Sequence, residues 1–579
     1  MNGRFRVVNN MKMAKTMCPG SPALTSSANF VHLFHYAGRK KMNRYHLIGL
    51  SAAGGIMAGL AWTSWFSGLI LLTAFVPFFL IENHLFENQS RYRVNSYFVY
   101  LLPGMIIFNT MSVGWVRAAS IPAMITVITG MSFMMAFTLW MAHIIRIKAG
   151  TVTGSAAIIS LWLAFEFLTL NVPLLSPWIN LGNGLAKEIL FIQWYEATGT
   201  GGGTLWILLS NLLLTFLIVN LLTQERRYRL FAGLWAALVI VPSVISVTRY
   251  YTIKQNNSEL HETVIIQPNI DPFTEKFTIP FSDQLEKTLD LAEKGLKAGP
   301  LWVLTPETTV DDPVNEQDNK NNKYIESFRK FAGKNPGVAI VSGLVSYILY
   351  PADEVPPSNT AGKTDTTGAW YDHFNSAFLI DSSGVREIYH KSKLVPGIEM
   401  QLSSALGRFI DKIVPYLGGT KWGYGSQEER ECFVHPVTGQ TAAPVICYES
   451  AFGGYVAEYV RKGANVLFII TNDGWWKNTA GYKQHLSYAS LRAIETRRMV
   501  ARSANTGISC FIDIRGKVLQ QTPWWSEALL RGSTSTETRI TPYVRYGDYI
   551  LRFSAVLSIL ILAYVFIALP ARKKIQRFR

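Results

Sequence analysis

Charged side chains are scarce in this sequence. Asp, Glu, Lys and Arg make up 16% of its 579 residues, whereas soluble domains contain about 25%. Hydrophobic residues account for 49%. This balance argues against an ordinary soluble protein of this length and directs attention to apolar stretches long enough to cross a bilayer.

Cysteine is also rare, and no motif for a metal or cofactor is present. The four cysteines (Cys18, Cys432, Cys447 and Cys510) form no CxxC pair and have no Cys/His ligand spacing. A zinc site and a disulfide framework therefore have no support. No glycine-rich phosphate loop occurs either, so we expect neither a metal nor a cofactor.

The formal net charge is +16, which by itself is compatible with a nucleic-acid partner. The Lys and Arg residues, however, gather in short runs beside apolar segments and lack interleaved aromatics. That distribution is a membrane-topology signal rather than a nucleic-acid footprint. We therefore expect a membrane partner and no nucleic acid.

Apolar spans of roughly bilayer length divide the chain. We predict a cytoplasmic N-terminal tail (1–45), a seven-helix transmembrane domain (46–248), an external domain (249–545), an eighth transmembrane helix (546–570) and a basic tail (571–579). The seven spans of the first transmembrane domain are 46–62, 66–82, 95–113, 119–145, 153–171, 203–223 and 229–248.

Basic residues at alternate flanks set the predicted orientation. The positive-inside rule places such flanks, and here both termini, in the cytoplasm. The large domain is then external, which in a bacterium with two membranes means that a multi-pass inner-membrane protein carries it in the periplasm. The basic flanks contain Arg39, Lys40, Lys41 and Arg44; Arg91 and Arg93; Arg146 and Lys148; Arg226, Arg227 and Arg229; and the C-terminal run from Arg572, whereas the alternate loops contain only Arg117 and Lys187.

The external domain alternates short strand patterns with helical ones, which is typical of a layered α/β domain. Helices are predicted at 281–296, 451–462 and 482–498 from their apolar periodicity and position,. The predicted strands are 263–267, 301–306, 338–345, 374–380, 386–390, 443–446, 466–471 and 507–514.

Three predicted strand ends carry reactive side chains: Glu307 in WVLTPE, Lys391 in IYHKSK and Cys447 in PVICYE. Catalytic groups of α/β sheets gather beyond such ends. A thiol nucleophile needs a base, which Glu307 supplies, and a positive charge for the developing oxyanion. Lys393 rivals Lys391 for that last role, and each residue alone has a structural alternative as a buried thiol, a turn cap or an edge lysine.

The three segments resemble the catalytic motifs P-E, Y-x-K and C-Y-E of the nitrilase (carbon–nitrogen hydrolase) superfamily, in the same order. The resemblance covers roughly 263–540 and implies an α-β-β-α sandwich. It selects Lys391 over Lys393. It also implies supporting roles for the two residues after the nucleophile, Tyr448, whose backbone N–H is a candidate oxyanion donor, and Glu449.

With the membrane spans added, the chain resembles the apolipoprotein N-acyltransferase family. LVPGIE resembles that family's LVPFGE, which implies that Glu399 supports the catalytic Lys391, although Gly397 and Ile398 replace its Phe-Gly pair. Phe277 corresponds loosely to a substrate-binding Trp of many relatives. The paired Trp475 and Trp476 also suit a site at the membrane interface, with core packing or an edge contact with the helices as the equal alternative.

The resemblance implies an acyl transfer by a ping-pong reaction. Cys447 takes an acyl chain from a phospholipid, often phosphatidylethanolamine, as a thioester. The α-amine of diacylglyceryl-cysteine at a prolipoprotein N-terminus then accepts it. No cofactor is implied, and nothing demands more than a monomer.

Two other functions compete with acyl transfer. A membrane-tethered amidohydrolase shares the same three residues but uses water as the acceptor. A transporter with an accessory domain gains some support from Glu166, the main acidic residue within a predicted span,. A simple tether needs only one helix, and paired broken helices are not evident, so acyl transfer is the favoured prediction.

Overall fold

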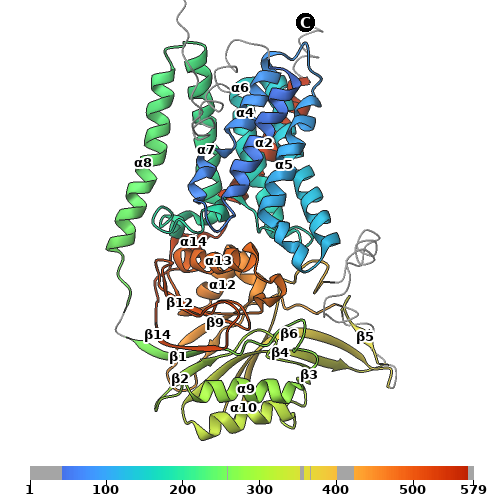
Figure 1. The fold of residues 1–579 in the computed structure, drawn as a ribbon, viewed down its shortest axis with the longest axis vertical. Coiled ribbons are helices and arrows are strands. Elements are labelled where there is room, and N and C mark those ends of the chain that lie inside the picture. The colour runs from blue at the N-terminus through green and yellow to red at the C-terminus, as the bar shows by residue number, and fades with distance from the viewer. Residues whose placement is uncertain (1–41, 257–258, 353–357, 365–366, 401–422, 571–579) are drawn as a thin grey trace, which may run out of the picture.

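The computed structural model describes residues 42–256, 259–352, 358–364, 367–400 and 423–570. A bundle of long helices occupies one end of the molecule, and two β-sheets with their helices occupy the other (Figure 1). The predicted tails, apart from residues 42–45, lie outside the described residues.

Six helical segments among the described residues are long and apolar enough to cross a membrane. Eight crossings were predicted, and this count is not confirmed. Helix α2 (Arg44–Leu60) has only 17 residues, fewer than the ~20 of a typical span,. Helix α6 (Ile121–Asn171) takes up two predicted spans. The six segments are Gly68–Glu87, Ser96–Ala118, Ile121–Asn171, Tyr195–Leu222, Tyr228–Thr252 and Tyr549–Ala568.

Helix α6 is not one straight helix. Gly150 has φ 84° and ψ 176°, a conformation that glycine adopts without steric cost, and it separates two helical arms,. A side chain at Gly154 would collide with Arg146 across this break. Arg146 and His143 both pair with the buried carboxylate of Glu82 on α4 (Val76–Glu87), so the charges near the break are neutralised inside the bundle,.

The remaining membrane helices follow the predicted spans closely. They are α5 (Ser96–Val113), α7 (Tyr195–Leu222), α8 (Tyr228–Thr252) and α15 (Tyr549–Ala563), with the short α3 (Leu71–Ala74) before α4. Apolar residues surround each of them almost evenly, as expected for helices packed against lipid on one side and protein on the other,. Helix α15 packs along α6.

The first sheet has the order β14-β1-β2-β4-β6-β5, with β3 beside β4 and β7 beside β6. Its centre is parallel and its flanks are antiparallel. The strands are β1 (Leu260–Gln267), β2 (Leu301–Leu304), β3 (Val310–Asn315), β4 (Val338–Tyr350), β5 (Gly362–Lys363), β6 (Trp370–Asp381), β7 (Gly384–His390) and β14 (Ala528–Ser535).

The second sheet has the order β13-β12-β11-β10-β9-β8. Strands β9, β10 and β11 run parallel, and every residue of β10 and β11 is buried, as expected for strands covered on both faces. The strands are β8 (Phe433–Val434), β9 (Thr441–Ile446), β10 (Val466–Thr471), β11 (Met499–Ala504), β12 (Cys510–Ile512) and β13 (Val518–Gln521).

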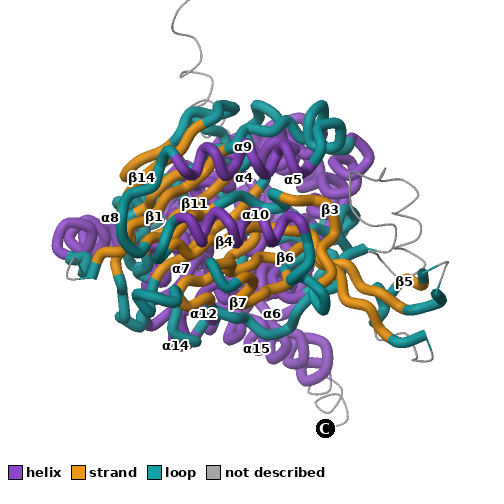
Figure 2. The backbone as a smooth tube through the Cα atoms, turned by 90° about the horizontal axis from the view of Figure 1, so that it is seen from below, coloured by secondary structure: helices purple, strands orange, loops and turns teal. Residues whose placement is uncertain are grey.

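The two sheets and their helices form four layers. Helices α9 (Phe281–Glu293) and α10 (Lys323–Lys334) cover the outer face of the first sheet, and Figure 2 shows them across its strands. Helices α12 (Gly453–Arg461) and α13 (Ala480–Thr496) cover the second sheet and lie between it and the bundle (Figure 1). This is the predicted nitrilase-like α/β domain.

Gln484 on α13 is one of the residues that join the two halves. Its buried amide oxygen accepts hydrogen bonds from the indole N–H groups of Trp115 (3.0 Å) and Trp178 (2.7 Å). Its amide nitrogen donates to the carbonyl oxygens of Trp62 (2.9 Å) and Ser112 (3.1 Å). A single apolar core likewise runs from the bundle into the space between the sheets.

Most predicted elements of this domain are present, with boundaries that differ by up to five residues. The helix predicted at 482–498 ends at Thr496, because Arg497 adopts a left-handed conformation (φ 52°). Strand β11 begins two residues later, at Met499. The strand predicted at 507–514 is reduced to β12, because a bend at 505–507 precedes it and a turn at 514–515 follows it. Two helices, α10 and α14 (Pro542–Tyr546), were not predicted, nor were strands β3, β5, β8, β11, β13 and β14.

Candidate active site

The three predicted catalytic residues follow strand ends and are all buried. Glu307 follows β2, Lys391 follows β7 and Cys447 follows β9. Their exposed fractions are 7%, 1% and 8%. Strands β2 and β7 belong to one sheet and β9 to the other. Glu307, Lys391 and Cys447 therefore come from both sheets and lie in the space between them.

Lys391 lies between two carboxylates. Its Nζ atom is 2.9 Å from Oε1 of Glu307 and 2.7 Å from Oε1 of Glu399. Burial opposes the charged form of Lys391, but these carboxylates outweigh burial and hold its pKa well above the ordinary value,. Lys391 is therefore a fixed positive charge.

Glu307 is held in its ionised form. Burial acts to raise its pKa, but the ammonium of Lys391 outweighs burial, and the pKa lies below the ordinary value,. The amide of Asn375 (2.8 Å) and the backbone N–H of Asn472 (3.1 Å) donate to its oxygens. The nearby thiol of Cys447 lowers the pKa of Glu307 further. An ionised carboxylate beside a thiol can act as its base.

Cys447 begins a short 3-10 helix (Cys447–Ala451) with a left-handed backbone, φ 49°. This backbone conformation is strained for a residue other than glycine, so surrounding contacts must hold Cys447 in it. Burial, and next the charge of Glu307, raise the pKa of the thiol well above its ordinary value. The thiol therefore needs Glu307 to remove its proton before it can react.

A buried network holds the main chain of Cys447. Nε2 of His485 lies 3.1 Å from the carbonyl oxygen of Cys447, and Nδ1 lies 2.9 Å from Oδ1 of Asp473. Arg502 donates to Oδ2 of Asp473 at 2.6 Å. Burial opposes ionisation of Asp473, but Arg502 and His485 outweigh it and lower the pKa of Asp473 to about 2.

The other two residues of the C-Y-E motif point away from the charged cluster. Oε1 of Glu449 accepts hydrogen bonds from the Tyr389 hydroxyl (2.6 Å) and the Ser392 backbone (2.7 Å). Its Oε2 accepts from the backbone N–H of Ile446 at 2.8 Å. Glu449 therefore ties the strand end before Cys447 to the segment that carries Lys391.

Tyr448 turns toward the membrane helices. Its hydroxyl donates to Oγ of Ser176 at 2.8 Å, and its ring stacks on Trp178 at 6.3 Å. The side chain thus anchors the segment after the nucleophile to the bundle. Only its backbone N–H is left for the predicted contribution to an oxyanion hole.

The three aromatic residues predicted to bind substrate lie in different surroundings. Phe277 is 56% exposed. Trp475 is half-buried and meets the ring of Phe273 at 5.4 Å. Trp476 packs against Trp115 (5.1 Å) at the junction with the bundle, the helix contact that the sequence left open as its alternative role.

Residues of the site that sequence reasoning missed are Asn375, Gly343 and the His485 network. Asn375 donates both to Glu307 and to Glu399 (3.1 Å). The visible signal was an amide within the mostly apolar strand predicted at 374–380. Gly343 allows the backbone of Glu307 to approach β4, since a Cβ there would lie 2.6 Å from Cα of Glu307.

Comparisons with known proteins agree with this architecture. A family model for the apolipoprotein N-acyltransferase N-terminal domain matches residues 54–213, and one for carbon-nitrogen hydrolases matches 338–539. The apolipoprotein N-acyltransferase of Chlorobaculum tepidum is 27% identical over 86% of this chain and 93% of its own length. That of Geobacter metallireducens is 28% identical over 75% of this chain and 78% of its own.

Among solved structures, Saccharomyces cerevisiae Nit3, a nitrilase-superfamily member, aligns with 53% of this chain and 97% of its own at 14% identity, with a TM-score of 0.35. The fold, the strand-end cluster and the two matched families define a membrane-embedded acyltransferase with a carbon–nitrogen hydrolase domain. Within that class, the chain belongs to the apolipoprotein N-acyltransferase family.

Proposed function

We propose that this protein transfers an acyl chain from a membrane phospholipid to the α-amine of a diacylglyceryl-cysteine at a lipoprotein N-terminus, through a thioester on Cys447. The observation that carries the mechanism is the burial of Glu307, Lys391 and Cys447 at the ends of facing strands, where Glu307 contacts Lys391 at 2.9 Å. The kinship with apolipoprotein N-acyltransferases supports the choice of substrates.

In the first half-reaction, Glu307 takes the thiol proton as the sulfur of Cys447 attacks the ester carbonyl of the phospholipid. The tetrahedral oxyanion is stabilised by the ammonium of Lys391 and by the backbone N–H of Tyr448. The intermediate then expels the glycerol oxygen, which takes the proton from Glu307. The products are a lysophospholipid and the thioester.

In the second half-reaction, the α-amine of the acceptor attacks the thioester carbonyl. Glu307 takes a proton from the attacking nitrogen and returns one to the departing sulfur of Cys447. Lys391 again faces the oxyanion, and the contact with Glu399 keeps the ammonium of Lys391 in position. Because Glu399 also contacts the ammonium, Lys391 keeps a partner while Glu307 holds a proton,.

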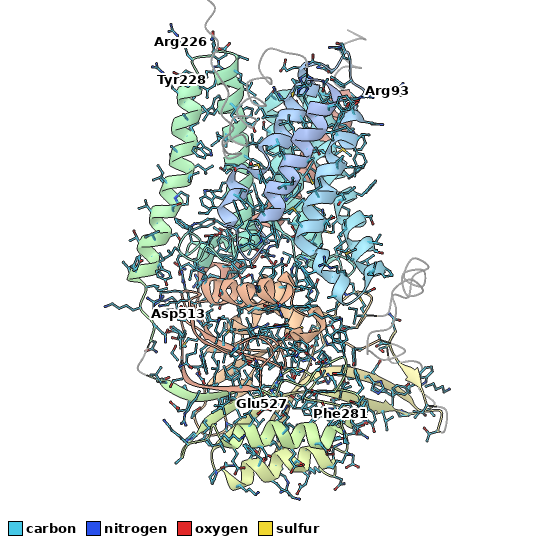
Figure 3. All side chains as sticks on the ribbon, viewed as in Figure 1. Arg93, Arg226, Tyr228, Phe281, Asp513 and Glu527 are labelled. Carbon is cyan, nitrogen blue, oxygen red and sulfur yellow. The ribbon has the colours of Figure 1, made fainter. Side chains whose placement is uncertain are left out.

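We further propose a topology of eight crossings, with both termini in the cytoplasm and the catalytic domain at 249–545 in the periplasm. It counts α2 and the two arms of α6 as separate spans. Arg93 and Arg226, both in predicted cytoplasmic flanks, lie at the end of the bundle remote from the sheets (Figure 3), which favours this orientation. We also propose that phosphatidylethanolamine is the acyl donor. The enzyme is proposed to act as a monomer, because all the candidate catalytic residues come from one chain.

Intact-mass analysis after incubation with labelled phospholipid tests the proposal. We expect one acyl adduct on the wild-type protein, cleaved by neutral hydroxylamine as a thioester is, and none on Cys447→Ser. Addition of a diacylated lipopeptide then moves the label onto its amine. Label released only as free fatty acid would favour a hydrolase, and a folded protein that never acquires the adduct would refute the mechanism.

A further inference from the structure

A cavity of about 580 Å³ lies beside the catalytic centre, where the catalytic domain meets the membrane helices. Lys393, two residues after Lys391, lines it, and so does Phe452, whose ring meets Tyr448 at 5.1 Å. The cavity therefore adjoins the centre, but none of its lining residues belongs to the Glu307–Lys391–Cys447 cluster.

The lining of the cavity is strongly cationic. Among the described residues, five basic side chains surround it, against one carboxylate, that of Asp548. That carboxylate already accepts a hydrogen bond from the Tyr543 hydroxyl at 2.6 Å, and burial raises its pKa. The basic residues are Lys393, Arg430, Arg461, Arg545 and Arg552.

Little in the described part of the chain neutralises these charges. Arg430 alone among the five forms an ion pair there, with Glu458 at 3.0 Å. Arg461 and Arg552 donate to backbone carbonyls, and Lys393 lies over the ring of Phe452 at 5.1 Å. Burial, and next the charge of Arg430, lower the pKa of Lys393. Converging cations without counter-charges form an anion site.

One wall of the cavity is apolar and comes from the membrane. Phe167 and Leu170 lie in the last turn of α6, which ends at Asn171, and Arg552 lies in the first turn of α15. Both helices are candidate membrane spans that pack together. The cavity thus sits where two spans leave the bilayer, with cations on the domain side and hydrocarbon on the membrane side.

We propose that this cavity binds the phosphate of an anionic membrane phospholipid, with an acyl chain running along Phe167 and Leu170. Arginine forks match phosphate oxygens in bidentate geometry. The apolar wall favours a lipid over free phosphate. The shortage of carboxylates disfavours a headgroup with its own ammonium, so phosphatidylglycerol binds more tightly here than phosphatidylethanolamine. This inference concerns binding and does not depend on acyl transfer.

The test compares lipid binding to the full-length protein and its variants in detergent by native mass spectrometry. The wild-type protein is titrated with phosphatidylglycerol, phosphatidylethanolamine and inorganic phosphate. Arg545→Gln/Arg552→Gln removes two exposed cations of the cavity. At roughly 1 kcal/mol for each basic residue near an anionic headgroup, we expect phosphatidylglycerol affinity to fall about 30-fold.

A charge-matched control is Arg329→Gln/Arg386→Gln, which removes two half-exposed arginines of α10 and β7 that lie outside the cavity. It should leave phosphatidylglycerol affinity within about 2-fold, as surface ion pairs contribute little. Cys447→Ser should bind the lipid like wild type, which separates this proposal from the catalytic one.

Cross-linking gives a second readout that needs no variant. A photoactivatable phosphatidylglycerol should label peptides containing 167–171 or 545–552. Equal binding of both phospholipids, unchanged affinity in the double variant, or label elsewhere would each overturn the proposal. Displacement of the lipid by millimolar inorganic phosphate alone would make the cavity a free-phosphate site instead and would also overturn it.

Discussion

Replacement of Gly343 by alanine should disable the active site without touching any reactive group. Gly343 lies on β4 behind the turn that carries Glu307. Its N–H donates to the carbonyl of Pro306 (3.1 Å), and its carbonyl accepts from Thr309 (2.7 Å). A Cβ atom at this position would lie 2.6 Å from Cα of Glu307 and from the backbone nitrogen of Thr308.

The size of the effect follows from that contact. Ordinary contacts to a Cβ begin at 3.4 Å, so the turn must retreat by about 0.8 Å. Strand β4 cannot yield instead, because β2 and β6 pair with it on either side. A misplacement of ~1 Å at a reacting group costs about 10²-fold in rate, and overpacking costs roughly 1–3 kcal/mol of stability.

The assay is the rate of acyl-thioester formation on Gly343→Ala, measured beside its thermal unfolding. Gly333→Ala is the matched control: Gly333 is exposed on α10 with nothing within 4 Å of an added Cβ. The control should keep full activity and gain roughly 0.5–1 kcal/mol of stability. Wild-type thioester formation by folded Gly343→Ala would refute the assigned position of Glu307 as base.

Three further predictions test the charges and contacts of the site. In Lys391→Met, the charge that opposes the effect of burial on Glu307 is lost, so the pKa of Glu307 rises. The ascending limb of the pH–rate profile should then move to higher pH, and the rate at neutral pH should fall about 10²–10³-fold. An unshifted limb would contradict the pairing of Glu307 with Lys391. Asp473, whose pKa is lowered to about 2, contributes stability that is complete above pH ~4 and lost as pH falls toward 2. About 2 kcal/mol should therefore disappear over that window in wild type but not in Asp473→Asn, as acid-dependent thermal unfolding will show. Tyr448→Phe loses the hydrogen bond to Ser176 but keeps its backbone N–H, so we expect about 1 kcal/mol less stability and less than ~10-fold loss of rate, and a larger loss would give the hydroxyl a role in the reaction,.

Local patterns were enough to group the candidate catalytic residues but not to predict the elements around them. Strand ends are visible in sequence, so Glu307, Lys391 and Cys447 could be grouped. Chemistry alone did not separate Lys391 from Lys393. The structure shows the physical difference: Lys391 is 1% exposed between two carboxylates, whereas Lys393 lines the neighbouring cationic cavity.

Non-local pairing explains most of what was missed. Strand β14 pairs with β1 across more than half of the catalytic domain, and no local signal encodes such a partner. Helix α10 is a different case, since Tyr324, Ile325, Phe328 and Phe331 form a regular apolar stripe that a count of helical periodicity would have detected. Hydropathy likewise separated the two arms of α6 without revealing that Gly150 alone joins them.

The four hydrogen bonds of Gln484 have a consequence for how substrates reach the enzyme. Pulling α13 away from the bundle would strip partners from two indoles and two carbonyls at once, each worth about 1–3 kcal/mol when buried,. The catalytic domain is therefore held at a fixed height above the bilayer. This fixed height selects among substrates, because a carbonyl or amine can react only if its own lipid anchor lets it reach the level of the active site.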